Sequence, residues 1–429
     1  MKSLNIPDHN FQRNAFLLKR LHAPLSCEQR NSSVNSHSLY AIVLHVAGQQ
    51  GAGMHSLVSF QCLTRYLSNS VKILEPVMVK TEYCGFDSTF PHRKGSVLFS
   101  DLFDLKHFNC ASELMERPPI VPRNQFLASA PKNVVLVKVN GVTKKRSTLQ
   151  IKVFWSADSK ASNPRNQKCY QESNQVISPL SRAGFCVIKV IDMLFDGQIS
   201  PGKLQKFISE DKSIQNVTIV FSEWRHYWYK SDVDFRILLS PSSKLILDVE
   251  YYERKFLRSN NKVAVMFRME HILRFLENQQ RIGSNHREQW SVEKCLLKAV
   301  EVTRTIQSSG RPMITLDIGK YGSDTTNMKL SSDSKAILSP LFGNTSSAFL
   351  EWENTFSQAT NGEENSAYIA ALQRILASRA KCLVLVGGGT FQRMSFDDYI
   401  INHPDKKDQC INVICNLRGA RWLQTEQLL

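Results

Sequence analysis

The stretch AGQQGAGMHS, residues 47–56, lies between an apolar run and an amphipathic one, and it decides the fold of the first part of the chain. The preceding run, SLYAIVLHV (38–46), is typical of a strand buried on both faces. After the glycines, apolar residues recur at helical spacing: Leu57, Phe60, Leu63 and Leu67. VKILEPVMV (71–79) then predicts a second buried strand. Strand, glycine turn, helix and strand form a βαβ unit with a right-handed crossover.

The same alternation continues along the chain. Continuous apolar runs predict further strands at 133–139, 149–155, 185–191, 216–224, 262–268, 312–319 and 381–389. Helical periodicity predicts helices at 269–280, 292–310 and 367–380. The pattern predicts an α/β protein with two doubly wound, Rossmann-like domains that face a cleft. We expect a disordered leader at 1–37, an N-terminal domain at 38–258 and a C-terminal domain at 259–429.

Composition supports a globular chain of two domains, because 429 residues exceed the size of most single cores. Apolar residues make up 42% and no run of about 18 apolar residues occurs, so no transmembrane helix is predicted. The net charge of +16 comes without a nucleic-acid recognition motif. We therefore expect an anionic small molecule or a nearby anionic membrane surface, and no nucleic acid.

The ten cysteines form no C-x-x-C pair, which argues against structural zinc; no metal site is predicted. Cys382, Cys410 and Cys415 lie close enough in sequence for one disulfide in an oxidising compartment, and buried free thiols are the alternative. Three N-x-S/T motifs occur, at Asn31, Asn216 and Asn344, which is no more than chance supplies.

Ligands of open α/β sheets bind at the carboxyl ends of parallel strands. In the first predicted domain this rule selects the turn after residue 46, which leads into a helix N-terminus suited to an anion. Tight packing without a ligand is the alternative. The spacing of Gly48, Gly51 and Gly53 differs from the G-x-G-x-x-G of dinucleotide folds. Glu75 at the end of the second strand, and the pair Tyr251-x-x-x-Lys255, leave a Rossmann NAD(P)-dependent oxidoreductase as an alternative.

In the second predicted domain the rule selects three strand ends. Arg268 ends the strand at 262–268, where its guanidinium could hold a phosphate by two hydrogen bonds or pair with Glu270 at the surface. ITLDIGKYGS (314–323) contributes Asp317, and VGGGTFQ (386–392) is a glycine nest whose side-chain donors are Thr390 and Gln392. Together these features predict a cleft lined by donors and cations that suits a nucleoside diphosphate.

An ordered set of motifs resembles the GDP-fucose protein O-fucosyltransferase superfamily, especially its plant-type members. The motifs are GQQGAGMHSLVSFQCL, ILEPVMV, LFSDLFDLKHFN (98–109), VAVMFRMEHI and ITLDIGKYGS. The resemblance implies a GT-B architecture and a metal-independent, inverting transfer of fucose from GDP-fucose to a protein or glycan hydroxyl, with no cofactor. It further implies the lumen of the endoplasmic reticulum or Golgi, with a membrane anchor outside this sequence.

The resemblance also assigns roles to residues. Arg268 holds the GDP phosphates, Asp317 faces guanine or ribose, and the nest around Thr390 completes the phosphate contacts. His55 and Glu270 are the titratable candidates near the chemistry. The predicted donor-binding set is Gly48, Gln50, Gly51, Ala52, Gly53, Arg268, Asp317, Gly319, Gly388, Gly389, Thr390, Phe391 and Gln392. Met266 replaces the family's histidine, which leaves an inactive relative that binds nucleotide sugar or glycan as an alternative.

Overall fold

The computed structural model describes residues 39–46, 50–68, 70–79, 83–86, 96–141, 150–156, 169, 177–195, 216–224, 239–256, 263–268, 292–306, 313–317, 366–387, 390–405 and 410–414. Its contacts divide the chain into two compact units. The first comprises Met1–Val79 and Tyr83–Ser242, and the second comprises Lys80–Glu82 and Ser243–Leu429. The predicted leader at 1–37 lies outside the described residues.

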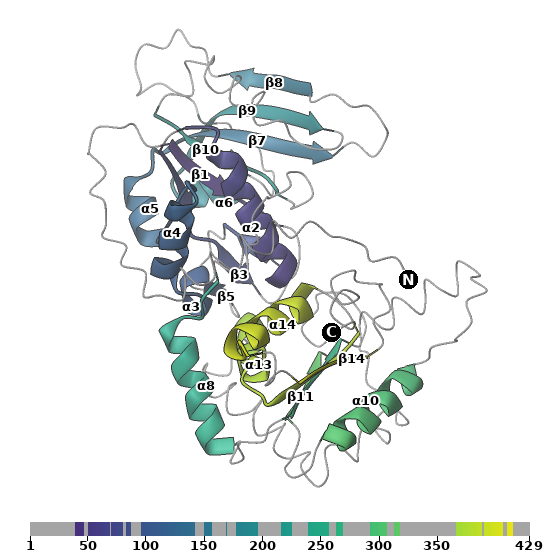
Figure 1. The fold of residues 1–429 in the computed structure, drawn as a ribbon. Helices are drawn as coiled ribbons and strands as arrows, with labels where there is room; N and C mark the ends of the chain where they lie inside the picture. Colours follow the sequence, from purple (N-terminus) through teal and green to yellow (C-terminus); the bar gives the residue numbers. More distant parts are fainter. Residues whose placement is uncertain are drawn as a thin grey trace, which may run out of the picture. The chain divides into compact units, whose positions relative to one another are not determined.

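The first unit contains a seven-stranded sheet. Its strands in chain order are β1 (Leu39–Val43), β2 (Val71–Leu74), β6 (Ile120–Val121), β7 (Asn133–Gly141), β8 (Gln150–Ser156), β9 (Cys186–Phe195) and β10 (Thr218–Phe221). In space the order is β6-β2-β1-β10-β7-β9-β8. Figure 1 labels the part from β1 to β8. Neighbouring strands pair in parallel except β8, which is antiparallel to β9. This confirms the predicted α/β class.

Helices pack on both faces of this sheet. The described helices of the unit are α2 (Gln50–Thr64), α3 (Phe99–Leu102), α4 (Leu105–Leu114), α5 (Arg123–Ser129) and α6 (Ser178–Arg182). On one face, Phe126 of α5 and Leu180 of α6 share a core cluster with Tyr40 of β1. On the other face, Phe60 of α2 makes an edge-to-face contact with Phe221 of β10. Successive side chains of a strand point to opposite faces, so the continuous apolar runs of the buried strands provide apolar residues for both faces of the sheet.

The predicted strand at 71–79 is wrong as a single element. β2 ends at Leu74, and Val77–Val79 forms β3 in a separate antiparallel sheet with β4 (Tyr83–Gly85) and β5 (Ser96–Leu98), in the order β4-β3-β5. The break falls at Pro76, whose nitrogen carries no hydrogen for a sheet ladder. The backbone N–H of Glu75 still donates to Val121, so the chain leaves the large sheet directly after Glu75.

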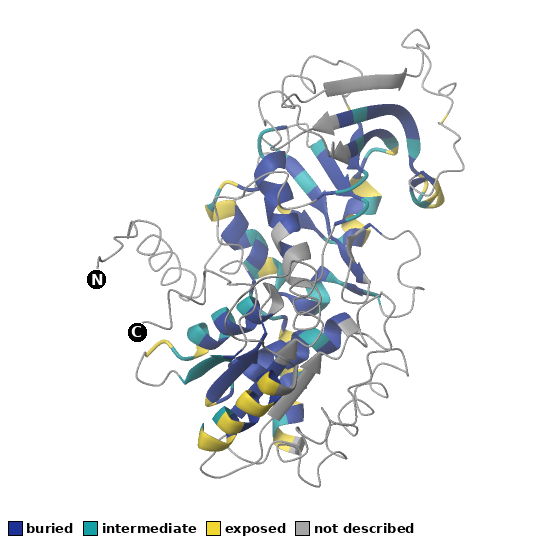
Figure 2. Ribbon diagram, turned by 90° about the vertical axis from the view of Figure 1, so that its right-hand side faces the viewer, coloured by how far each residue is buried: buried dark blue, intermediate teal, exposed yellow. Residues whose placement is uncertain are grey.

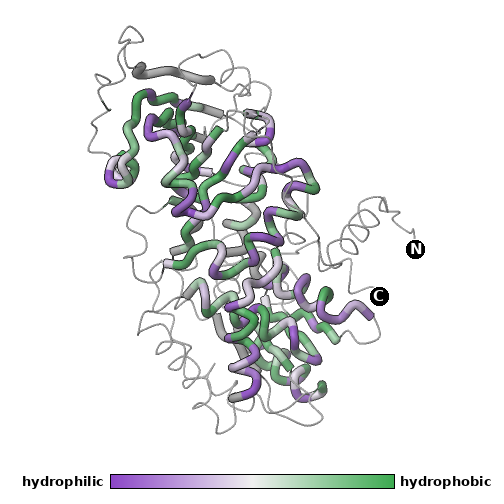
Figure 3. The backbone as a smooth tube through the Cα atoms, turned by 90° about the vertical axis from the view of Figure 1, so that its left-hand side faces the viewer, coloured by the Kyte–Doolittle hydropathy of each residue, from purple (hydrophilic) through white to green (hydrophobic). Residues whose placement is uncertain are grey.

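The second unit has a four-stranded, wholly parallel sheet in the order β12-β11-β13-β14. Its strands are β11 (Val263–Arg268), β12 (Met313–Asp317), β13 (Cys382–Val386) and β14 (Ile411–Ile414). Its described helices are α8 (Ser243–Phe256), α10 (Val292–Ile306), α13 (Ser366–Ser378) and α14 (Thr390–Asn402). In Figure 2 β13 and the first four residues of β11 are buried, β14 is mostly of intermediate exposure, and α10 carries exposed residues on its outward face. Figure 3 shows hydrophobic residues concentrated in the interior of each unit.

Helix α8 belongs to the second unit, whereas the sequence placed the domain boundary at 258/259. The reason is its packing on α13. The hydroxyl of Tyr368 donates to the carboxylate of Asp248, and Arg379 donates to Glu253 at 3.1 Å. Leu245 and Val249 on the same helix are fully buried. The boundary between the two units therefore lies between Ser242 and Ser243.

The predicted helix at 269–280 lies outside the described residues, and α14 and β14 were not predicted. Among the described helices, none combines the length and the apolar character that a membrane crossing requires.

Candidate nucleotide-binding edge of the second unit

Strand order places a topological switch point in the second unit. From β11 the chain moves to β12 on one side, and later to β13 and β14 on the other. Such a reversal opens a crevice at the carboxyl ends of the two central strands, where open α/β sheets bind ligands. The register brings the ends together: Arg268 lies opposite Asp317, and Phe267 lies opposite Val386. The backbones of Arg268 and Asp317 thus lie at one edge; their side chains lie outside the described residues.

The chain turns sharply after β13 and enters a helix. Gly387 has a φ of 94°, a left-handed conformation that glycine adopts without a steric penalty. Its N–H donates to Ile414 at 2.9 Å, which fixes the turn to β14. Helix α14 begins at Thr390, so its unpaired N–H groups and positive dipole end lie just beyond the carboxyl end of β13. Gly388 and Gly389 lie outside the described residues, as do the side chains of Thr390 and Phe391.

Gln392 differs from the prediction that its amide donates to a ligand. The side chain is fully buried in the first turn of α14. Its Nε2 donates to the carbonyl of Met266 at 3.2 Å and to that of Val386 at 2.9 Å. Both amide hydrogens are therefore used inside the protein, one on β11 and one on β13. Gln392 ties the helix start to the two strands that flank the switch point.

Further contacts fix the rest of α14 against α13. The guanidinium Nε of Arg374, which is fully buried, lies 2.8 Å from Oδ2 of Asp398. Burial raises the pKa of Asp398, and the positive charge of Arg374 opposes that rise. Asn402 donates to the hydroxyl of Ser378 at 2.8 Å. These contacts hold the helix that points its N-terminus at the candidate site.

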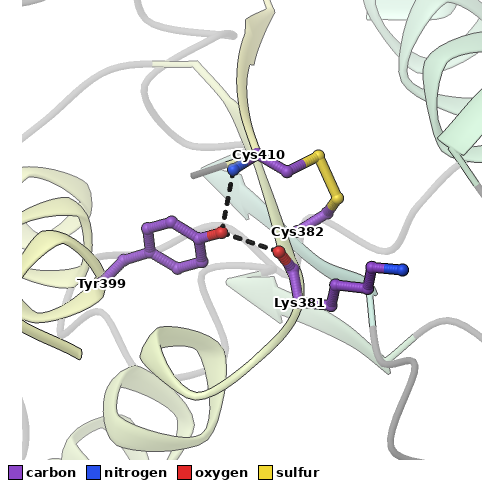
Figure 4. Close-up of a disulfide and its surroundings, with 4 residues drawn as sticks. All are labelled: Lys381, Cys382, Tyr399 and Cys410. Carbon is purple, nitrogen blue, oxygen red and sulfur yellow. Dashed lines mark hydrogen bonds between the residues drawn. A yellow bond between two sulfur atoms is a disulfide. The ribbon is translucent and has the colours of Figure 1, made fainter. Parts of the chain in front are cut away.

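A disulfide and a tyrosine hold the opposite edge of the sheet (Figure 4). Cys382 at the start of β13 is bonded to Cys410, directly before β14, and the Cα atoms lie 4.6 Å apart. The hydroxyl of Tyr399 donates to the carbonyl of Lys381 at 2.7 Å and accepts from the N–H of Cys410 at 3.1 Å. This pairing is one of the disulfides that the sequence left open; Cys415 lies outside the described residues.

The remaining predicted site residues fall in three groups. In the first unit α2 begins at Gln50, so Gly51, Ala52 and Gly53 lie in its first turn rather than in a free loop. His55 also lies on α2, and its side chain, like that of Gln50, is outside the described part of the structure. Gly48, Glu270 and Gly319 lie outside the described residues altogether. Their predicted roles stay predictions.

The acidic residues of the first unit's motifs have structural roles that the sequence reasoning missed. Glu75 is buried; its Oε1 accepts from the N–H of Ser100 at 2.9 Å and its Oε2 from that of Arg123 at 3.2 Å. One carboxylate thus caps the N-termini of α3 and α5. Asp104 caps α4 by accepting from the N–H of His107 at 2.9 Å. For Asp104 the signal was an acidic residue directly before a helix, whereas the caps by Glu75 join segments far apart in sequence and left no local signal.

The segment LFSDLFDLKHFN contributes a small aromatic cluster to the core of the first unit. Phe99, Phe103 and Phe108 are fully buried, with ring centroids 5.0 and 4.9 Å from that of Phe99. The side chain of Asn109 donates to the carbonyl of Ile120 at 2.7 Å and accepts from its N–H at 2.8 Å, so it extends the pairing of β6. Among the described residues no cluster of side chains could hold a metal ion.

Comparison with known proteins gives distant structural similarity alone. No protein-family model matches the chain, and no curated protein matches it. The chain is similar to the crystal structure of POFUT1 in complex with GDP-fucose, with 11% identity and a TM-score of 0.49 over 88% of this chain and 99% of that one. It is similar to the apo-form of POFUT1 with 11% identity and a TM-score of 0.48 over 89% and 99%. The fold described above rests on the strand orders of the two sheets.

Proposed function

We propose that the chain is a fucosyltransferase-like glycosyltransferase that binds a nucleotide diphosphate sugar at the carboxyl edge of β11, β12 and β13. The supporting observation is that three features occur at one edge of the sheet. They are the switch of strand order, the strand ends Arg268 and Asp317, which lie opposite each other, and the N-terminus of α14. GDP-fucose is the proposed donor because the ordered sequence motifs resemble those of fucosyltransferases. The acceptor is a protein or glycan hydroxyl.

The chemistry of such a transfer needs a place for negative charge. The bond between sugar C1 and the diphosphate oxygen breaks, the acceptor oxygen bonds to C1 from the opposite face, and the acceptor proton moves to a base. The departing GDP gains charge, which a guanidinium at Arg268 and the N–H groups at the start of α14 stabilise. In enzymes, removal of one such hydrogen-bond donor raises the activation free energy by about 3 kcal/mol. Glu270 and His55 remain the predicted bases.

A second candidate is a relative that binds the nucleotide sugar without turnover. Met266, at the position of the family's histidine, is 3% exposed, so its side chain packs in the core of the unit. A thioether there neither donates nor takes a proton. The oxidoreductase alternative loses its main support, because both oxygens of Glu75 cap helices and are not free for a ribose.

We also propose that the chain matures in an oxidising lumen. Six described cysteines are disulfide-bonded: Cys110, Cys169, Cys186, Cys295, Cys382 and Cys410. Persistent disulfides are rare in reducing compartments, whereas the secretory lumen forms them. The location proposed from the family resemblance thus has independent support from the sulfur chemistry.

Thermal unfolding with candidate ligands tests the donor proposal. GDP or GDP-fucose at a hundred times its dissociation constant should stabilise the wild type by about 2.7 kcal/mol, whereas NADH and NADPH should not. Arg268→Ala should abolish the GDP effect, and Arg304→Ala, an exposed arginine on α10, is the matched control that should keep it. Stabilisation by nicotinamide nucleotides alone would overturn the proposal. GDP binding without any donor hydrolysis or transfer would favour the inactive relative.

A further inference from the structure

We propose that Asn216 carries an N-linked glycan. Asn216-Val217-Thr218 is an acceptor motif, and Asn216 lies exposed in the turn before β10. Its φ of 56° is a left-handed conformation, which asparagine tolerates better than most non-glycine residues. Because this side chain is exposed, a bulky group on it can project into solvent without displacing a packed residue of the described part of the chain.

The glycan would lie at the amino edge of the first sheet. β1, β10 and β7 run parallel, and Asn216 precedes the first residue of β10. Ligand sites of such sheets form at the opposite, carboxyl edge, where α2 begins in this unit. Modification at Asn216 therefore leaves the carboxyl edge of the first sheet uncovered.

The attachment of a glycan to Asn216 needs a sugar donor, which the proposed compartment provides. This inference rests on the proposed oxidising lumen, where the donor is an oligosaccharide linked to a lipid by a diphosphate. The amide nitrogen of Asn216 bonds to C1 of the first sugar, the bond from C1 to the diphosphate oxygen breaks, and the lipid diphosphate leaves. The amide gives up one proton to a base of the transferase. No oxidant or reductant is needed.

The fold also dictates when the transfer takes place. Thr218 is fully buried, and its hydroxyl donates to the carbonyl of Pro131 at 2.7 Å. In register, Thr218 lies between Tyr40 of β1 and Val134 of β7. A transferase that reads the threonine hydroxyl has no access to it once β10 is paired. The glycan is therefore attached before β10 enters the sheet, while the chain is still unfolded there.

A glycosylation assay on the full chain tests this. The chain is expressed behind a cleavable secretion signal in cells that make N-linked glycans, with Asn31→Gln and Asn344→Gln removing the other two motifs. We expect one mobility shift that a peptide N-glycanase removes, and no shift when Asn216→Gln is added. Thr218→Ser, which keeps the motif and the hydroxyl, should retain the shift. A double variant without a shift would overturn the inference.

A second readout guards against misfolding of the variants. In the secreted wild type, glycanase treatment converts a glycosylated Asn216 to aspartate, which peptide mass spectrometry detects; an unconverted Asn216 in that peptide overturns the inference. Counting free thiols in the same sample separates the two ideas. Free thiols at Cys382 and Cys410 would defeat the proposed lumen itself, whereas disulfides with an unmodified Asn216 would defeat this inference alone.

Discussion

The buried amide of Gln392 is the residue that links the candidate site to the packing of the second unit. Its two hydrogen bonds end on the carbonyls of Met266 and Val386, two residues before Arg268 and at the end of β13. A buried carbonyl that loses its donor costs about 1–3 kcal/mol. Gln392 therefore stabilises the unit and sets the geometry at the strand ends.

Gln392→Leu should lower the free energy of unfolding by about 2 kcal/mol, since leucine fills similar space but donates no hydrogen bond. It should also weaken GDP binding, because the strand ends and the helix start lose their common tie. Urea unfolding and calorimetric GDP titration measure the two effects.

Gln373→Leu is the matched control for this change. Gln373 is a buried glutamine on α13 whose Nε2 has no hydrogen-bond partner in the described part of the chain. Its replacement should cost little stability and leave GDP affinity unchanged. Equal losses in the two variants would contradict the role given to Gln392.

Glu75→Gln should destabilise the first unit by about 2 kcal/mol, because the amide replaces one of the two oxygens that accept helix N–H groups. Chemical denaturation followed by circular dichroism measures the loss. Glu113→Gln on α4, an exposed position, should be neutral. A loss below a few tenths of a kcal/mol for Glu75→Gln would rule out a shared cap.

Sequence reasoning located these polar residues but not their roles. Glu75, Asp101 and Asp104 stand in motifs that suggest chemistry, yet Asp101 accepts from the N–H of Leu98 and Asp104 from that of His107. Capping is a local interaction and could have been predicted from an acidic residue before a helix. The double cap of Glu75 joins residues 25 and 48 positions apart, which only the tertiary fold determines.

At the level of elements, α14 is fixed to α13 by the ion pair between the fully buried Arg374 and Asp398, whose side chain is 18% exposed. Arg374→Met should lower the free energy of unfolding by about 3 kcal/mol, because it leaves a buried carboxylate without its counter-charge. Arg374→Met with Asp398→Leu should recover most of the loss. Thermal or urea unfolding of both variants is the measurement. A double variant as unstable as the single one would contradict the explanation.

The stability of the Arg374→Met variant should also depend more strongly on pH than that of the wild type. Burial raises the pKa of Asp398, and the variant lacks the charge that opposes this. A raised folded-state pKa gives stability that is present below the unfolded pKa and is lost as the pH rises through the folded value. The deficit relative to wild type should therefore be smaller at about pH 4 than at about pH 8. A deficit that is constant with pH would show that Asp398 does not titrate in this way.

The disulfide between Cys382 and Cys410 closes a loop with a sequence separation of 28 and should contribute about 3–4 kcal/mol. Serine at both positions should release β14 first, since among the described strands β14 pairs only with β13, while β13 also pairs with β11. Hydrogen exchange should rise at Ile411–Ile414 before it rises at Cys382–Val386. Simultaneous loss of protection in both strands would contradict this order.

Elements with long apolar runs were predictable, and those that depend on context were not. β7, β10, β11 and β13 coincide with continuous apolar stretches rich in valine, isoleucine and leucine, which are typical of buried parallel strands. β14 has half-buried residues and no such run. Helix α14 was taken for part of a glycine nest, because its first turn follows three glycines in sequence. The break within 71–79 could have been predicted from Pro76, but the apolar residues on both sides of it led to the prediction of a single strand.

For the whole molecule, the alternation of strands and helices predicted two doubly wound units. Each unit has a sheet with a switch of strand order, wholly parallel in the second unit and parallel except for β8 in the first. The strand order itself was not predictable, because long-range pairing leaves no local pattern in the sequence. The register of β11 and β12, which composition does not reveal, places the backbone of Arg268 beside that of Asp317. The net charge of +16 fits an anionic ligand but does not identify one.

Hydrogen exchange with and without saturating GDP tests the central proposal most directly. We predict that GDP slows exchange at the carboxyl ends of β11, β12 and β13 and in the first turn of α14, and that Arg268→Ala removes this protection. Strand β14 and helix α8 serve as internal references whose exchange should not change. Protection confined to the first unit, or none at saturating GDP, would contradict the assignment of the nucleotide to this edge.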